Sequence, residues 1–154
     1  MPTHIEIVSA ERRLLEDDVD EVIAPTDRGQ IGILPRHAAM LTLLIPGELR
    51  LKKGGEEQII AIGGGFLEVG DNRVTILADS AERAEEVDIA RAEEARRRAM
   101  ARLTSRSREV DVERAQLALS RSLARIKAVE HSRQRGGRAP RPTLTGSGYP
   151  PDLT

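Results

Sequence analysis

The chain has 154 residues, of which 39% are hydrophobic, and a formal net charge of −1 at pH 7. This length fits one compact domain with a smaller attachment and excludes a large multidomain protein. The sequence contains no cysteine and only two aromatic residues, Phe66 and Tyr149, so a disulfide framework, a thiolate metal site and an aromatic platform for nucleic-acid bases are all excluded.

The first half of the chain has the pattern of a β-rich domain. Short runs rich in Val, Ile and Leu follow one another from Thr3 to Ala78. Such runs at this spacing predict an antiparallel β-sandwich, and we expect about ten strands. The runs are separated by turn signals at Thr26-Asp27-Arg28-Gly29, Pro46-Gly47, Lys53-Gly54-Gly55, Gly63-Gly64-Gly65 and Gly70-Asp71-Asn72.

Two features of this half could be mistaken for catalytic motifs. Gly63-Gly64-Gly65 is glycine-rich, but no Lys-Ser or Lys-Thr follows it, so we interpret it as a hairpin turn rather than a phosphate loop. Glu16, Asp17, Asp18 and Asp20 precede an apolar run. We interpret them as a solvated strand edge that discourages pairing with another chain.

The periodicity changes after Ala78, where apolar residues recur at spacings of three and four. Asp88 is a good N-cap for a first helix ending near Leu103, and Asp111 can cap a second helix. Because the connection is short, we predict an antiparallel helical hairpin. The first helix places mostly alanine on its apolar stripe, so the hairpin buries little surface and should be marginally stable.

Three parts are expected from this pattern. Residues 1–86 form the β-sandwich domain and residues 87–131 form the helical hairpin. Residues 132–154 are rich in Gly, Pro, Arg and Ser without periodicity, which predicts a disordered tail. Residues 1–86 carry 9 basic and 17 acidic side chains, and residues 87–154 carry 15 and 8, so the two halves should meet different partners.

The hairpin offers one candidate binding site. Arg91 and Arg98 share a face of the first helix, and Arg121 and Arg125 share a face of the second. In a folded hairpin these four guanidinium groups can converge on an anion such as phosphate, with Asp88 nearby. A solvated, charged outer face is the alternative, and spacing alone does not decide between them. No His has a carboxylate or second His at metal-ligand spacing, so we predict no metal site.

Several motifs resemble one known family in order and spacing. These motifs are residues 29–38 (GQIGILPRHA), 46–50 (PGELR), 64–69 (GGFLEV), 74–78 (VTILA) and 81–85 (AERAE). With them the chain is similar to the epsilon subunit of F-type ATP synthases, and the resemblance continues through the hairpin to about His131.

This resemblance implies a non-catalytic rotor subunit that joins the gamma subunit to the ring of c subunits. It implies a flattened ten-stranded sandwich followed by two helices. The loop that contacts the c-ring and gamma would contain Gly29, Gln30, Ile31, Arg36 and His37. Family members often have an acidic residue where this chain has Gln30, which weakens a charge-pair explanation of that contact. His37 is expected to hold the loop by hydrogen bonds.

The resemblance also implies an ATP site without hydrolysis. Glu82 and Asp88 would contact the adenosine end, and the arginines would neutralise the phosphates, with Val87 a mild departure from the family pattern. ATP is then a regulatory ligand, and no cofactor is required. The implied ATP-binding residues are Glu82, Asp88, Arg91, Ala92, Arg98, Arg121 and Arg125.

A regulatory mechanism follows from the family. ATP would favour a hairpin folded on the sandwich, and without ATP the extended helices would contact the alpha and beta subunits and block hydrolysis. The chain shows no membrane-spanning run and no signal peptide, so it should not insert directly into a membrane. The family implies a peripheral location on the cytoplasmic side of a bacterial membrane, although a chloroplast-encoded member would look similar.

Two other function classes remain open. An Arg-rich nucleic-acid-associated adaptor is suggested by Arg133, Arg135, Arg138 and Arg141, although the charge balance and the lack of a reading motif argue against nucleic-acid binding. An enzyme on a small β-sandwich is the weaker alternative, because no nucleophile and base can be paired from this sequence.

Overall fold

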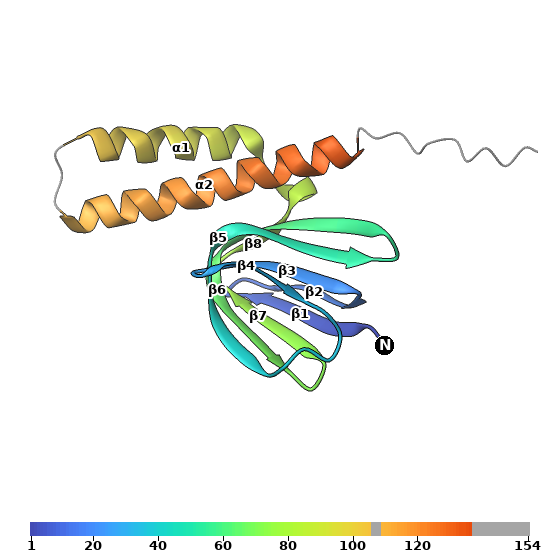
Figure 1. Cartoon of the computed structure of the whole chain (residues 1–154). Coiled ribbons are helices and arrows are strands. Elements are labelled where there is room, and N and C mark those ends of the chain that lie inside the picture. The colour runs from blue at the N-terminus through green and yellow to red at the C-terminus, as the bar shows by residue number, and fades with distance from the viewer. Residues whose placement is uncertain (106–108, 137–154) are drawn as a thin grey trace, which may run out of the picture.

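The computed structural model describes residues 1–105 and 109–136 of the chain. Eight strands build an N-terminal β-sandwich, and two helices form a hairpin that lies across one end of it (Figure 1). The strands are β1 (Thr3–Ser9), β2 (Arg13–Val19), β3 (Glu21–Thr26), β4 (Gly29–Ile33), β5 (Met40–Lys53), β6 (Glu56–Gly70), β7 (Arg73–Ala78) and β8 (Ala81–Arg83). A 3-10 turn, η1 (Ala84–Glu86), leads to α1 (Ile89–Thr104) and α2 (Glu109–Gly136).

The structure has eight strands rather than the expected ten because two expected turns lie inside long strands. Pro46 in β5 is in register with Gly63 in β6, so both strands continue through these positions. Gly65 has φ +138° and an added Cβ would lie 2.1 Å from the carbonyl oxygen of Leu77, so only glycine fits there. The predicted turn at Pro46-Gly47 and the predicted hairpin turn at Gly63-Gly64-Gly65 are therefore wrong.

The two long strands connect the layers of the sandwich. From Gly65 onward β6 pairs with β7, whereas at Ile60–Ile62 it pairs with β8. The two halves of β6 therefore have different neighbouring strands. The hydrogen-bonded order is β2-β1-β7-β6-β5-β3-β4, with β8 attached to β6. The pairing is antiparallel except between β1 and β7, which run parallel. This one pair differs from the purely antiparallel expectation, because β1 and β7 are brought together by the fold rather than by a hairpin.

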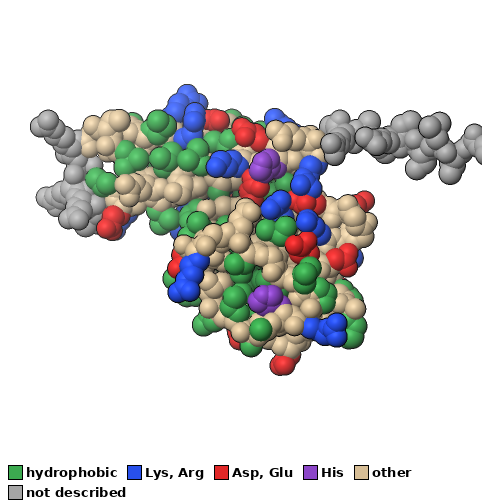
Figure 2. Space-filling view, in the orientation of Figure 1, with side chains coloured by type: hydrophobic (Ala, Val, Ile, Leu, Met, Phe, Trp, Pro, Cys, Tyr) green, Lys and Arg blue, Asp and Glu red, His purple; other side chains and the backbone are tan. Residues whose placement is uncertain are grey.

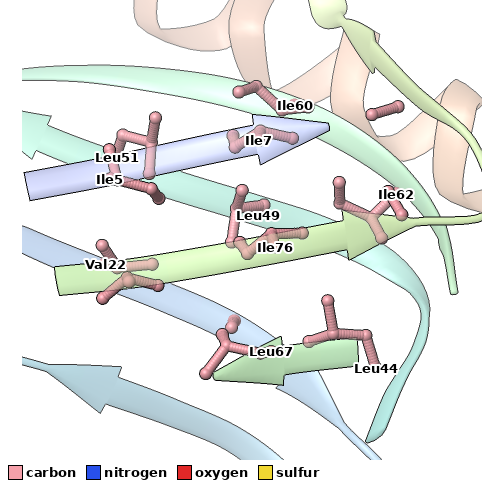
Figure 3. Close-up of a cluster of buried hydrophobic side chains, with 14 of the residues drawn as sticks. Ile5, Ile7, Val22, Leu44, Leu49, Leu51, Ile60, Ile62, Leu67 and Ile76 are labelled. Atoms are coloured by element: carbon pink, nitrogen blue, oxygen red, sulfur yellow. The ribbon is translucent and has the colours of Figure 1, made fainter. Parts of the chain in front are cut away.

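The core lies between the layers and consists of aliphatic side chains (Figure 3). Along β1, Ile5 and Ile7 are fully buried and alternate with partly exposed residues, as expected for a strand with one buried face. Leu49, Ile60 and Leu67 fill the interior from β5 and β6. Each such side chain contributes about 1.5–3 kcal/mol by burial.

The acidic strand β2 lies at one edge of the sheet, as its composition predicts. His4 of β1 lies beside it, with Nδ1 2.9 Å from Asp18 and Nε2 3.1 Å from Glu16. These two hydrogen bonds, the one with Asp18 first, raise the pKa of His4 above its ordinary value. Charged side chains of both signs therefore cover this edge strand, which discourages its backbone from pairing with another strand.

Both helices form, but the second differs from its predicted limits. Asp88 caps α1 as predicted, because its side chain accepts a hydrogen bond from the backbone N–H of Arg91. α2 begins at Glu109, so Asp111 lies inside the helix and is not its cap. α2 ends at Gly136, so residues 132–136 are helical and not tail; residues 137–154 lie outside the described part. Within residues 1–105 and 109–136, no helix is long and apolar enough to cross a membrane.

The hairpin packs through small side chains. α2 lies between α1 and the sandwich (Figure 1). Ala92 and Ala99 of α1 are buried against α2. Ala128 of α2 packs with Ile59, Ala61 and Ala84 in a second, smaller apolar cluster. The alanine-rich seam expected from the sequence is therefore present, and it allows close approach with little buried surface.

Candidate functional site

A cavity of about 530 Å³ lies where the hairpin meets the sandwich. Both helices, the segment before α1 and the β1–β2 loop contribute to its wall. Three guanidinium groups line it, and so do four carboxylates. The lining residues are Glu11, Glu82, Glu86, Asp88, Arg91, Ala92, Ala95, Arg98 and Arg125.

The first turn of α1 brings three of the predicted residues together. Asp88 Oδ1 accepts a hydrogen bond of 3.1 Å from the backbone N–H of Arg91, which fixes the start of the helix at the cavity. Ala92 is buried on the inner face, so the backbone of the other helix can approach closely. Arg91 is exposed, which leaves its guanidinium group accessible to a ligand in the cavity.

Two further arginines of the cavity are already paired with carboxylates. Arg125 Nε donates to Glu82 Oε1 at 2.9 Å, and Arg98 donates to Glu94 at 3.0 Å within α1. A bound anion would compete with Glu82 and Glu94 for these guanidinium groups. Both pairs are at least partly exposed, so exchanging the carboxylate for a ligand costs little.

The fourth predicted arginine lies outside this cavity. Arg121 Nε donates to the backbone carbonyl of Gly63 at 3.0 Å, and its guanidinium group lies 3.7 Å from Asp79. It therefore fastens α2 to the glycine segment of β6. Arg121 could reach a ligand in the cavity only after leaving Gly63 and Asp79.

The cavity also contains residues that the sequence pattern did not single out. Glu11 comes from the β1–β2 loop, 78 residues before the start of α1, and no local signal places it there. Hydrogen bonds from Arg12 and then Arg83 lower the pKa of Glu86, which keeps this carboxylate charged. The described part of the chain holds no group of three or more His, Cys, Asp or Glu residues arranged for a metal ion.

The predicted contact loop is structured by backbone and side-chain hydrogen bonds. Gln30 Oε1 accepts from Arg50 at 3.4 Å. Arg36 has φ +62°, and its backbone N–H donates to Asn72 at 3.0 Å. His37 Nδ1 lies 2.8 Å from the carbonyl oxygen of Ala38. Gly29 and Ile31 belong to β4, so the five predicted residues span a strand and the loop after it.

A row of exposed apolar side chains crosses three strands of the sandwich. Leu43 is in register with Phe66, and Phe66 with Leu77. Their exposed fractions are 48%, 52% and 56%. Large apolar side chains exposed in a continuous row mark a contact surface for another protein. The sequence pattern does not single out these three residues, because alternation shows which residues share a face but not which face is solvated.

The structure describes two of the four arginines that suggest a nucleic-acid adaptor, and both are exposed. Arg135 is ion-paired with Glu57 of the sandwich, and Arg133 is exposed on the same turn of α2. Arg138 and Arg141 lie outside the described residues.

Two family models match nearly all of the described chain. The β-sandwich domain of the ATP synthase delta/epsilon chain matches residues 2–84. The long α-helix domain of the same chain matches residues 85–130. The boundary between the two models falls in η1, where the sandwich gives way to the hairpin.

Curated relatives and solved structures agree with these matches. An ATP synthase epsilon chain of Chloroflexus aurantiacus is 60% identical over 96 residues, which cover 62% of this chain and 69% of the relative. One from Roseiflexus is 62% identical over 95 residues, covering 62% and 68%. A chain in the Euglena gracilis mitochondrial ATP synthase (OSCP/F1/c-ring) superposes with a TM-score of 0.71 at 25% identity, covering 85% of this chain and 81% of that one.

Proposed function

The chain belongs to the ATP synthase delta/epsilon family, and we propose that its helical hairpin binds ATP and thereby regulates ATP hydrolysis by the enzyme. It is a non-catalytic, epsilon-type subunit of the central stalk of an F-type ATP synthase. In this function the hairpin would regulate ATP hydrolysis, and the sandwich would connect gamma to the c-ring.

For the sandwich, we propose contacts with gamma and the c-ring. The exposed row of Leu43, Phe66 and Leu77 is apolar enough to bury against a neighbouring subunit. The loop from β4 to His37 is held by the hydrogen bond from Arg36 N–H to Asn72, in the turn between β6 and β7, and by that between His37 and Ala38, which supports a preformed contact. As a subunit of this enzyme the chain would be peripheral to the membrane, and its relatives favour the cytoplasmic side of a bacterial cell membrane.

The observation that carries the ATP proposal is the gathering of Arg91, Arg98 and Arg125 from both helices around one cavity. Its volume of about 530 Å³ is within the range of small-molecule sites. ATP needs cationic groups for its phosphates and hydrogen-bond acceptors for its amino group and ribose. The guanidinium groups and the carboxylates of Glu82 and Asp88 supply both kinds.

ATP would stabilise the docked hairpin because only this arrangement brings both helices to one ligand. In an extended hairpin Arg125 would move away from Glu82, and the cavity would no longer exist. A ligand that binds one state shifts the population toward it. The undocked helices would then be free to contact the alpha and beta subunits and inhibit hydrolysis.

Isothermal titration calorimetry of the full chain tests this proposal. We expect saturable one-to-one binding of ATP, tighter than that of ADP. Changing both Arg98→Gln and Arg125→Gln should weaken binding by at least about a hundredfold, because each charged hydrogen bond contributes about 1.5–3 kcal/mol. A single Arg121→Gln variant measures whether that side chain joins the ligand.

A matched control uses arginines of the same helices that do not line the cavity. Arg97→Gln with Arg114→Gln removes the same charge from exposed positions and should leave ATP affinity within about twofold of the unchanged chain. Equal losses in both variants would mean that only overall charge matters. No binding at millimolar ATP would remove the nucleotide site and leave the rotor assignment in place.

A further inference from the structure

The last turns of α2 extend beyond the part of the chain that matches the family. The long α-helix model ends at residue 130, whereas α2 continues to Gly136. Most side chains of this extra segment, residues 131–136, are exposed, but two of them reach the sandwich. Figure 2 shows acidic and basic side chains mixed where the hairpin meets the sandwich. The contacts of this segment are therefore an addition to the attachments made by Arg121 and Arg125.

Two side chains of the segment contact carboxylates of the sandwich. His131 Nδ1 lies 2.7 Å from Glu48 Oε2 on β5. Because an ionised carboxylate only accepts hydrogen bonds, Nδ1 carries the proton and donates it. The guanidinium group of Arg135 pairs with Glu57 Oε2 on β6. The two contacts join α2 to both of the long strands.

Both carboxylates are almost removed from solvent. The side chain of Glu48 is 10% exposed and that of Glu57 is 6% exposed. Within the described residues, one oxygen of each has no hydrogen-bond partner, although Arg50 lies 3.8 Å from the free oxygen of Glu57. A desolvated carboxylate is costly unless a partner compensates it. The docked position of α2 therefore depends on His131 and Arg135 remaining in place.

We propose that His131 and Arg135 form a second anchor, which holds the hairpin docked on the sandwich when no nucleotide is bound. This inference rests on the proposed mobility of the hairpin. Departure of the hairpin breaks the charge-assisted hydrogen bonds that His131 and Arg135 make to Glu48 and Glu57. Such bonds are stronger than neutral ones, so the anchor opposes departure without any ligand. ATP then stabilises further a docked state that already exists. At low ATP, fewer molecules are undocked than if only Arg121 and Arg125 held the hairpin.

The test measures the position of the hairpin in the full chain without nucleotide. Because the sequence has no cysteine, Asp27→Cys in the β3–β4 turn and Glu113→Cys on α2 allow two specific spin labels at exposed positions. The combined His131→Ala and Arg135→Gln variant should raise the undocked-to-docked ratio at least about tenfold, since hydrogen bonds to charged groups are among the stronger ones. The control, Glu130→Ala with Arg133→Gln, changes exposed neighbours and should leave the distance distribution unchanged.

A second variant tests the buried-charge explanation. Glu57→Gln keeps the shape of the side chain and removes its charge, so adding it to Arg135→Gln should restore part of the docking that Arg135→Gln alone removes. If Arg121→Gln with Arg125→Gln shifts the distance distribution between the spin labels but the anchor variant does not, the anchor is overturned and the mobile hairpin is not. A distribution that no variant shifts would overturn both.

Discussion

The sandwich and the hairpin are stabilised in different ways. The sandwich encloses large aliphatic side chains, such as Ile5, Leu49 and Ile76, that are fully buried between its layers. The hairpin buries mainly alanine, and α1 is attached to the rest of the molecule chiefly through α2. Polar contacts fasten α2 to the sandwich, for example Arg125 with Glu82.

This difference in packing predicts that the sandwich is rigid and that the hairpin can move. The buried aliphatic side chains of the sandwich stabilise one arrangement of its strands. Because these side chains interlock and have few alternative arrangements, moving one strand against another would lose that stability. An alanine seam and partly exposed ion pairs contribute little and can be remade with other partners. The proposed function, in which the sandwich couples rotation and the hairpin changes position, would use these opposite properties.

The largest loss of stability is expected from a substitution in the core of the sandwich. Leu67 of β6 is fully buried among the core residues (Figure 3). Leu67→Ala should lower the free energy of unfolding by about 2–5 kcal/mol, because it leaves a cavity in a close-packed interior. Chemical denaturation measures the change. A loss below about 0.5 kcal/mol, the size typical of surface substitutions, would mean that the sandwich is not the rigid part.

A smaller and local effect is expected at the base of the hairpin. Ala128 is fully buried against Ile59, Ala61 and Ala84. Ala128→Leu should weaken docking by about 1–3 kcal/mol through overpacking while the sandwich keeps its stability. Hydrogen exchange should then show lost protection in α1 and α2 alone. Ala101→Leu, at an exposed site of α1, is the control and should change neither the docking of the hairpin nor the protection of its amides. If Ala128→Leu reduced protection equally in the sandwich, the two parts would not be stabilised independently.

The smallest effect on stability is expected on the outer face of the sandwich. Phe66→Ser removes a half-exposed side chain, so the free energy of unfolding should change by no more than about 1 kcal/mol. Binding to an ATP synthase preparation lacking this subunit should nevertheless weaken at least about tenfold, as for a central interface residue. Co-sedimentation measures it, with exposed Glu56→Ser as the control. Unimpaired binding would place the gamma contact elsewhere.

Local sequence patterns predicted the elements better than their connections. The change from short aliphatic runs to a helical period after Ala78 predicted a β domain followed by two helices, and Asp88 marked the first helix correctly. The glycines of Gly63–Gly65 look the same in a turn as in a bent strand, because both need backbone without Cβ. Only the pairing of β6 with β5, β7 and β8 distinguishes the two.

The end of α2 shows the same limit. Residues 132–154 are rich in Gly, Pro, Arg and Ser and have no periodicity, which predicts a helix that stops near His131. In the structure the helix continues to Gly136, and His131 and Arg135 contact Glu48 and Glu57 on the sandwich. These partners are more than 70 residues away in the sequence, beyond any local pattern.

The sequence by itself determined the family and the order of sandwich and hairpin. It also selected seven residues for ATP, six of which line one cavity in the structure, and their role in ATP binding stays a prediction. These depend on local spacing and motif, which the chain carries in its linear order. The tertiary structure alone decided that Arg121 instead fastens α2 to Gly63, that Glu11 and Glu86 join the cavity, and that residues 131–136 dock. Each of these depends on which charged groups meet across the fold and how much water they lose there, and those quantities exist only after packing.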